Sequence, residues 1–278
     1  MTEELKKLIY KNKEKIKNAL VILLVIGVLW ILHDLPILKY AVTGEEVYEG
    51  VKLINLSGKT VFISDMHLDS KNFNENSNRD GMFPVNLPAD VENMVIVGDL
   101  FDSPKIFNNL AKSANGSKDL SKPFCRALEF VNNSPGNIYF VVGSPSHDPA
   151  YLADSDFDFS CESSRVHVVG RLAIFEIGGD IFAAHHGDYI AGGGVDCVVS
   201  YFSKKSGNPM ILEKLWRNFV SLDENYWLIT AHSHIPAIDY EKKVANAGAW
   251  KHVPIIGGDL KNVIIVENSS VRLVKLAG

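Results

Sequence analysis

The chain has 278 residues and lacks several features that would place it in a common class of protein. Its three cysteines, at positions 125, 161 and 197, form no CxxC pair and no disulfide framework, so we expect buried or unpaired thiols. A net charge of −5 argues against a broad basic surface, which makes nucleic acid an unexpected partner. The glycine-rich stretch 191–195 lacks the lysine of a Walker loop, and this argues against nucleotide-loop binding.

The composition that remains is ordinary for a globular protein, 46% hydrophobic and 22% charged, with enough apolar residues for a sizeable core. The N-terminus differs from the rest. Six lysines between positions 6 and 17 precede an apolar run over residues 19–32, which resumes at residues 35–38. Counted to its end, the run reaches the length of roughly 20 residues that a membrane-spanning helix needs.

We therefore predict a basic flank over residues 1–18, a membrane anchor helix over residues 19–42 and a catalytic domain over residues 51–278. The flank and apolar run also resemble a signal peptide, but no small-x-small cleavage site closes them. The lysines before the span predict a cytoplasmic N-terminus and an extracytoplasmic domain, although Lys39, Lys52 and Lys59 weaken that bias. A buried core helix and a helix lying on the inner membrane face are the alternatives.

Short apolar strands are expected along the body, among them residues 51–55 and 60–64, which a hairpin-like turn joins. Residues 211–222 are expected to form a helix that buries Leu212, Leu215, Trp216 and Phe219.

Metal-type ligands follow five of the expected strands. These residues are Asp65 and His67, Asp99, His147 and Asp148, His186, and His232 and His234. Five of the nine histidines stand at these strand ends, whereas structural histidines would scatter. Asp65 and His67 are two positions apart, so on an extended chain their side chains would point the same way. Of the adjacent His185 and His186, at most one is expected to be a ligand, because neighbours on a strand face opposite ways.

Carboxylates and imidazoles without thiolate suit Mn, Fe or Zn better than a structural zinc site. A carboxylate such as Asp99 can bridge two ions, and two ions about 3.5–4 Å apart can activate a hydroxide and hold phosphoryl oxygens during in-line attack. His147, which Asp148 follows, can act as a general acid held in its charged form by that carboxylate.

In their order, these motifs resemble D-x-H, G-D, G-N-H-D/E, H and G-H-x-H of the calcineurin-type metallophosphoesterases. They read here as Asp65-Met66-His67, Gly98-Asp99, Gly143…His147-Asp148, His186-Gly187 and Ala231-His232-Ser233-His234. The resemblance covers roughly residues 60–250 and implies an α/β fold, a four-layer α-β-β-α sandwich of two mixed sheets, here preceded by the N-terminal apolar helix. The motifs are most similar to the branch of UDP-2,3-diacylglucosamine pyrophosphatases. No substrate is carried over, because that branch has Arg where His147 stands.

The resemblance also implies the metal ligands of a site with two divalent ions. One ion would be held by Asp65, His67 and His234, and the other by His186 and His232, with Asp99 as the bridge.

Further roles follow from the same resemblance. His147 would stabilise the transition state or protonate the leaving oxygen, and Asp148 would orient it. Ser146 stands where the family has a metal-binding Asn, and its neutral hydroxyl would be a weaker ligand. Ala231 replaces the usual Gly, which is a mild departure.

We therefore expect a membrane-anchored metallophosphoesterase, a two-metal hydrolase of phosphoester or pyrophosphate bonds with a phosphorylated small-molecule or lipid substrate. A metal-dependent nuclease of the same superfamily is the first alternative, and the acidic charge and the anchor count against it. A non-catalytic membrane-bound scaffold with a degenerate metal site is the second alternative. Ser146 favours the scaffold, whereas the complete histidine set opposes it.

Overall fold

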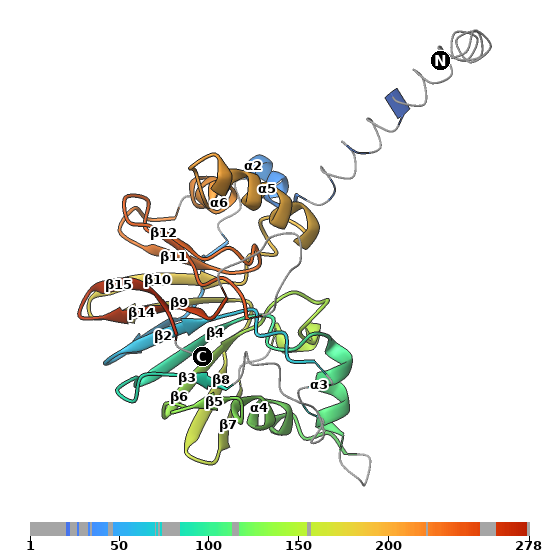
Figure 1. Ribbon diagram of the computed structural model, residues 1–278, viewed down its shortest axis with the longest axis vertical. Helices are drawn as coiled ribbons and strands as arrows, with labels where there is room; N and C mark the ends of the chain where they lie inside the picture. The colour runs from blue at the N-terminus through green and yellow to red at the C-terminus, as the bar shows by residue number, and fades with distance from the viewer. Residues whose placement is uncertain are drawn as a thin grey trace, which may run out of the picture.

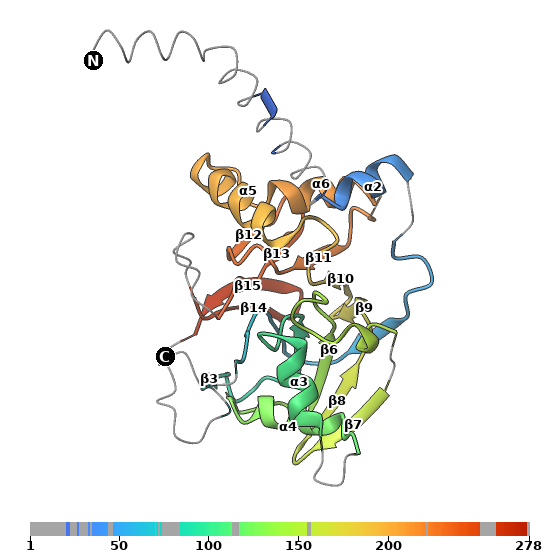
Figure 2. The same ribbon diagram turned by 90° about the vertical axis from the view of Figure 1, so that its right-hand side faces the viewer.

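The computed structural model describes residues 21–22, 27, 33, 35–43, 47–69, 71, 73, 84–112, 117–154, 157–220, 222–250 and 260–276. Within them, two large mixed sheets lie face to face, and helices cover the outer face of each sheet (Figures 1 and 2). The expected α/β arrangement of two mixed sheets is therefore confirmed.

The six-stranded sheet runs, in order across it, β1 (Leu53–Leu56), β9 (Leu172–Ile177), β10 (Asp180–His185), β11 (Trp227–Thr230), β13 (Val244–Asn246) and β12 (Ala237–Asp239). The seven-stranded sheet runs β15 (Ser270–Lys275), β14 (Asn262–Glu267), β2 (Thr60–Ile63), β4 (Asn93–Val97), β6 (Asn137–Val141), β8 (Ser164–Val168) and β7 (Phe157–Cys161). A small parallel pair consists of β3 (Val85–Asn86) and β5 (Val131–Asn132).

The helices form two outer layers. The six-stranded sheet is covered by α2 (Ile37–Thr43), α5 (Gly193–Lys205) and α6 (Ile211–Phe219). The seven-stranded sheet is covered by α3 (Pro104–Ala111) and α4 (Ser121–Leu128), and a 3₁₀ turn spans Ala150–Leu152.

Three apolar cores separate these four layers. The central one packs Phe62 and Val95 of the seven-stranded sheet against Phe175 and Phe182 of the six-stranded sheet. Every residue of β2 and β4 is buried, because the sheet is covered on both faces. Parallel strands in that environment read as continuous apolar runs, which is why residues 61–63 and 94–97 could be predicted as strands.

The expected hairpin between residues 51–55 and 60–64 is wrong. Strand β1 pairs in parallel with β9 in one sheet, whereas β2 pairs with β4 and β14 in the other. The short turn around Gly58 therefore passes the chain from one sheet to the other. Turn residues specify a change of direction, but they do not specify which strand becomes the partner.

Several elements were missed in the sequence, the short strands β3 and β5 among them, and one helix face was misassigned. Strand β7 was not predicted, and α5 begins inside the glycine-rich stretch, where helix propensity is poor. Helix α6 was predicted to bury Leu215, but this side chain is exposed, and Glu213 and Arg217 are buried instead. The guanidinium of Arg217 donates to the carbonyl oxygens of Tyr226 and Asp223, so its burial leaves these donors satisfied.

The expectation of unpaired thiols is wrong for two of the three cysteines. Cys125 on α4 and Cys161 on β7 form a disulfide, with their Cα atoms 5.1 Å apart and a sequence separation of 36. Spacing that wide gives no recognisable framework, because the pairing depends on how α4 packs on the seven-stranded sheet.

Most of the predicted anchor lies outside the described residues, as do most of residues 70–83. Within the described parts of the chain, no helix combines the length and the apolarity that crossing a bilayer requires. The end of the predicted anchor, residues 37–42, lies in α2 and packs on the body. Ile37 and Tyr40 are buried, and the ring centroid of Tyr40 lies 4.8 Å from that of Trp216 on α6.

Candidate metal centre

The predicted ligands gather because parallel neighbouring strands end at the same edge of each sheet. Asp65 and His67 follow β2, and Asp99 follows the parallel neighbour β4. His186 follows β10, and His232 follows its parallel neighbour β11. His234 lies two positions further along the same loop. The carboxyl ends of parallel strands are where ligands bind in α/β sheets.

Hydrogen bonds hold these four loops together. The amide of His67 donates to the Asp99 carbonyl at 3.0 Å, and the amide of Ala231 donates to the His186 carbonyl at 2.9 Å. Asp65 connects the two sheets, because its Oδ2 accepts from the amide of His232 at 3.1 Å. Each sheet therefore supplies ligands to one shared centre.

Five of these residues have left-handed backbone conformations. Their φ angles are 49° at Asp65, 46° at His67, 49° at Asp99, 66° at His232 and 59° at His234. The expectation that Asp65 and His67 lie on an extended chain is therefore wrong, although both side chains enter the centre. Left-handed non-glycine residues cost free energy and concentrate at functional sites.

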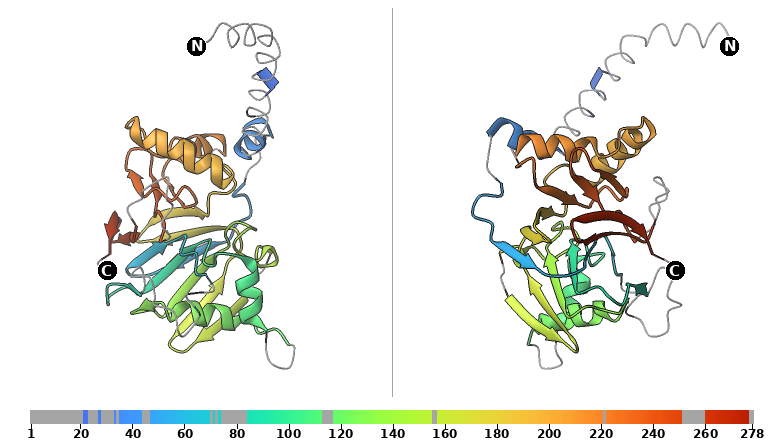
Figure 3. Two further views of the ribbon diagram at one scale, coloured as in Figure 1. Left: turned by 45° about the vertical axis from the view of Figure 1, so that its right-hand side comes forward. Right: turned by 90° about the vertical axis from the view of Figure 1, so that its left-hand side faces the viewer.

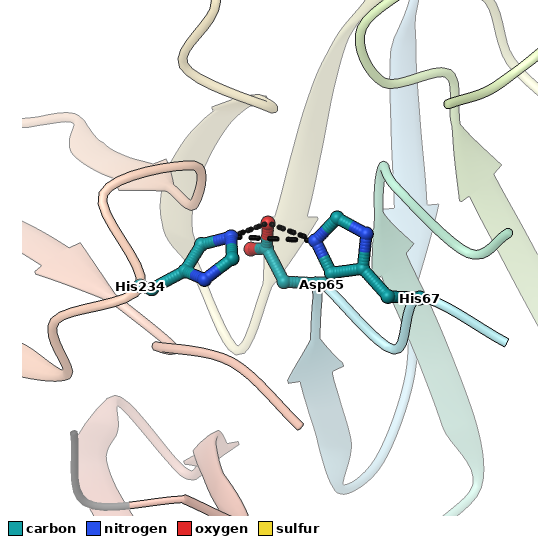
Figure 4. A group of neighbouring side chains, drawn as sticks. All are labelled: Asp65, His67 and His234. Atoms are coloured by element: carbon teal, nitrogen blue, oxygen red, sulfur yellow. Dashed lines mark hydrogen bonds and ion pairs between the residues drawn. The ribbon is translucent and has the colours of Figure 1, made fainter. Parts of the chain in front are cut away.

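The first ligand group consists of Asp65, His67 and His234 (Figure 4). Oδ1 of Asp65 lies 3.2 Å from Nε2 of His234 and 3.6 Å from Nε2 of His67. The two Nε2 atoms are 3.3 Å apart. Asp65 Oδ1 is buried and makes no well-aligned hydrogen bond to any described residue. An acceptor surrounded by imidazole nitrogens fits a bound cation.

The second group consists of Asp99, His186 and His232. Nε2 of His186 lies 3.0 Å from Oδ2 of Asp99 and 3.1 Å from Nδ1 of His232. Nδ1 of His186 faces the carbonyl oxygen of Val97 at 3.0 Å, so this nitrogen carries the hydrogen. In the neutral ring, Nε2 then carries a lone pair on the side of the Asp99 carboxylate. A metal-ligating histidine likewise donates from one ring nitrogen to a carbonyl and coordinates the ion with the other.

Asp65 also approaches the second group, since its Oδ1 lies 3.9 Å from Nε2 of His186. Asp99 was predicted to bridge the two ions. Among the described residues, Asp65 Oδ1 is the carboxylate oxygen that lies within 4 Å of imidazoles from both groups. Asp99 Oδ2 lies near His186 and 3.8 Å from Nε2 of His147.

The charges of the centre reinforce one another. Burial opposes charging of both carboxyl groups, but His186 and the other imidazoles of the centre together outweigh it. They hold the pKa of Asp65 well below its usual range and lower that of Asp99 to about 2. Burial also opposes protonation of His186, yet Asp99 and Asp65 raise its pKa well above the usual value. Burial and the charge of His186 lower the pKa of His232 to about 4. Two buried carboxylates thus require positive charge between them.

Asp102 is a site residue that was missed. It forms a third group with His67 and His147. Its Oδ1 lies 3.8 Å from Nδ1 of His67, on the side of the ring away from Asp65. Its carbonyl oxygen lies 2.9 Å from Nδ1 of His147. The signal was the second carboxylate in Gly98-Asp99-Leu100-Phe101-Asp102, three positions after a predicted ligand.

Asp148 does not orient His147 in the way that was expected. Its Oδ2 accepts hydrogen bonds from the amides of Asp99 and Gly143, both at 2.8 Å. Burial and the charge of Asp99 raise its pKa to about 7. Asp148 therefore supports the backbone of the two ligand loops, and the carbonyl of Asp102 orients His147.

Ser146, the predicted replacement for Asn, has an exposed side chain. Its Oγ lies 3.0 Å from Oγ of Ser144, and it is the buried Ser144 that reaches the centre. Oγ of Ser144 donates to Oδ1 of Asp99 at 3.0 Å, and the amide of Ser144 donates to the same oxygen at 2.9 Å. His185 points away from the centre, as expected, and packs against Trp216.

No protein-family model matches the chain, and the search of curated proteins found no match. Solved structures do show distant similarity. A phosphoesterase from E. coli, Yfce, is 14% identical over 79% of this chain and 100% of its own, with a TM-score of 0.33.

Two further solved structures are similarly distant. Vps29 from Entamoeba histolytica, complexed with Zn²⁺, is 12% identical over 78% of this chain and 98% of its own, with a TM-score of 0.34. A cold-active protein-tyrosine phosphatase of a psychrophilic Shewanella is 11% identical over 80% of this chain and 78% of its own, with a TM-score of 0.36. Similarities this distant do not decide the function, so the geometry of the centre must.

Proposed function

We propose that the chain is a metal-dependent hydrolase of phosphoester or pyrophosphate bonds that uses two divalent ions, with Mn, Fe or Zn as the candidates. The observation that supports this most is the pair of Asp–His–His groups joined at Asp65, whose Oδ1 lies within 4 Å of imidazole nitrogens from both. Paired carboxylate and imidazole ligands without thiolate suit catalytic rather than structural ions. When bound, two such ions supply Lewis-acid stabilisation of phosphoryl oxygens and a nucleophile at neutral pH.

The protein's own contribution begins with Asp65, His67 and His234 for one ion and with Asp99, His186 and His232 for the other. The Val97 carbonyl fixes the tautomer of His186, and the Asp102 carboxylate lies beside the outer nitrogen of His67. Such outer partners keep the coordinating nitrogens oriented and basic. The left-handed loops hold the set before any substrate arrives, which favours electrostatic preorganisation.

His147 is the candidate general acid. Its Nδ1 faces the Asp102 carbonyl and therefore carries a hydrogen, and its Nε2 points toward Asp99 from a half-exposed position at the edge of the centre. In the protonated ring, Nε2–H donates to a leaving oxygen at this edge. Positioned acids of this kind contribute about 10²- to 10⁴-fold to rate.

The membrane anchor and the extracytoplasmic location belong to the same proposal. The apolar run over residues 19–32 and its basic flank support the anchor. The disulfide between Cys125 and Cys161 supports an oxidising compartment for the body, because disulfides persist mainly outside the reducing cytosol. A phosphorylated small molecule or lipid is the proposed substrate class.

The test combines metal content with hydrolysis of bis-p-nitrophenyl phosphate by the full chain, after chelation and after resupply of Mn²⁺, Zn²⁺ or Fe²⁺. We expect two equivalents of metal and metal-dependent turnover. Asp65→Asn should abolish turnover and release more than one equivalent, because Asp65 faces both groups. The matched control is Asp158→Asn, which removes a surface carboxylate paired with His167. Absence of turnover on a panel of phosphoesters, with or without bound metal, would overturn the proposed hydrolase and favour the non-catalytic scaffold with a degenerate metal site.

A further inference from the structure

The outer face of the helical layer on the six-stranded sheet is unusually apolar. In Figures 1, 2 and 3, helices α2, α5 and α6 lie side by side in this layer. Five of their described large apolar side chains are exposed, namely Leu38, Val42, Val198, Phe202 and Leu215. Phe202 is 63% exposed and Val42 is 87% exposed. We refer to these five residues and the exposed lysines of the same helices as the outer helical face.

The exposed apolar residues of α5 lie on the side of the helix that faces away from the core. Val198 and Phe202 are four positions apart, so they lie on one side of α5. The opposite side of α5 carries Asp196, Ser200 and Ser203, all of them buried. Helix α5 therefore differs from an ordinary surface helix. It buries these three polar residues as well as Val195, and it partly buries Val199, while the large apolar side chains of Val198 and Phe202 are exposed.

The charges of the same face have one sign. Lys39, Lys204 and Lys205 are exposed, whereas the two acidic residues of these three helices, Asp196 and Glu213, are buried. The whole chain carries a net charge of −5, so a basic apolar face is a local feature and not a consequence of composition. Aromatic and aliphatic side chains beside lysines are typical of surfaces that lie in the headgroup region of anionic membranes.

The position of α2 in the chain identifies the membrane as the occupant. Helix α2 begins at Ile37, with four residues between it and the apolar run over residues 19–32. Val21 and Ile22 in that run are themselves exposed. If this run enters a bilayer, a chain segment of only a few residues separates it from α2, so the outer helical face must lie next to the lipid surface.

We propose that the outer helical face docks on a lipid bilayer that contains anionic lipids, with Phe202 and its apolar neighbours in the interfacial region and the three lysines at the headgroups. The proposal goes beyond the anchor, because it assigns a membrane-contacting surface to the folded body and fixes which layer faces the lipid. It does not depend on hydrolysis, since none of these residues belongs to the metal centre.

The test is hydrogen exchange of the full chain in nanodiscs of phosphatidylcholine, with and without phosphatidylglycerol. We expect slower amide exchange in α2 and α5 on the anionic discs, with α3 and α4 unchanged. Each lysine near an anionic surface contributes roughly fivefold to binding, so Lys204→Glu with Lys205→Glu should lower the docked-to-undocked ratio about 25-fold or more. Lys105→Glu with Lys112→Glu, the same change on the opposite helical layer, should leave it unaltered.

Two alternatives would overturn the proposal. Equal exchange in both kinds of disc, unaffected by Lys204→Glu with Lys205→Glu, would mean that the chain's own N-terminal segment or a second copy covers the face. A concentration-dependent dimer that Phe202→Ser disrupts would identify the second copy. Hydrolysis of a soluble phosphoester should be the same in all of these variants, so a failure of the proposed activity is recognised separately.

Discussion

Ser144 supplies the hydroxyl of the loop after β6 that reaches the metal centre. Its Oγ and its amide both donate to Oδ1 of Asp99. Groups that orient a metal ligand are typically worth 10- to 100-fold in metal affinity, so Ser144→Ala should weaken the more labile ion by about tenfold or more. Competition with a chromophoric chelator measures this, and Ser146→Ala is the matched control. A larger effect of Ser146→Ala would restore the ligand that the sequence predicted.

Asp102 and His147 have separable roles. Asp102→Asn keeps the carbonyl oxygen that orients His147 but removes the carboxylate near Nδ1 of His67. We expect weaker metal binding and a turnover number close to wild type at saturating metal. His147→Gln should do the reverse, with unchanged metal affinity and turnover reduced by about 10²- to 10⁴-fold. Metal titration and steady-state kinetics on both variants check this, and a shared loss of both properties would contradict it.

The metal centre could be predicted from the types of residue at the strand ends, but the backbone conformations of these residues could not be predicted. Asp65, His67 and Asp99 could be selected because carboxylates and imidazoles have few other reasons to stand at consecutive strand ends. Their left-handed φ angles leave no trace in the sequence. The position of the Ser146 side chain could not be predicted for a similar reason. The amides of His147 and Asp148 both donate to the Ser144 carbonyl, and this tight turn leaves the side chain of Ser146 exposed to solvent.

Between α5 and α6 lies a buried acidic pair, Asp196 and Glu213. Burial, and then the charge of Glu213, raise the pKa of Asp196 well above its usual value. Because the folded pKa exceeds the unfolded one, the stability that Asp196 contributes is complete below about pH 4 and is lost as pH rises through the folded pKa. Asp196→Asn cannot ionise and still accepts the hydrogen bond from Ser200. Its free energy of unfolding should therefore increase relative to wild type as pH rises.

Urea denaturation of the chelated protein at about pH 5 and about pH 8 checks this difference. Asp158→Asn is the control of opposite sign. His167 and Arg165 outweigh the effect of burial and lower the pKa of Asp158, so its removal should cost a little stability at the higher pH only. Parallel pH dependence in wild type and Asp196→Asn would show that Asp196 is already ionised in the folded protein at about pH 5, so that its folded pKa does not lie within this range.

Strands with a continuous apolar run could be predicted from the sequence. The buried face of a helix that buries charged residues could not. Strands β2 and β4 are covered on both faces, so their composition alone marks them. Helix α6 was predicted as a helix, but its orientation was wrong because Glu213 and Arg217 are satisfied by groups outside the helix. Asn246 donates to Glu213, and the acceptors of Arg217 lie in the loop before β11. Hydrophobic periodicity carries no information about such partners.

The stability of the whole molecule should depend on whether an N-terminal truncation keeps or removes α2. Deleting residues 1–42 would remove most of α2 and expose the surface on Trp216 that Ile37 and Tyr40 cover. Burying two such side chains contributes roughly 3 kcal/mol or more, so this deletion should lower the free energy of unfolding by about that amount. Deleting residues 1–34 keeps α2 and should leave the stability of the body unchanged. Chemical denaturation of the two truncated chains compares them directly, and equal stability would contradict the packing of α2.

The centre takes its two carboxylates from the ends of β2 and β4 in one sheet and three of its imidazoles from beyond β10 and β11 in the other. An ion coordinated by both sets is therefore also a cross-link across the central apolar core. Because such an ion binds only the assembled sandwich, its free concentration enters the folding equilibrium by mass action. Thermal resistance of the molecule then becomes a function of the metal supply around it. Where that supply fails, the two sheets are held together by the apolar contacts between them and by the few backbone bonds that join their loops.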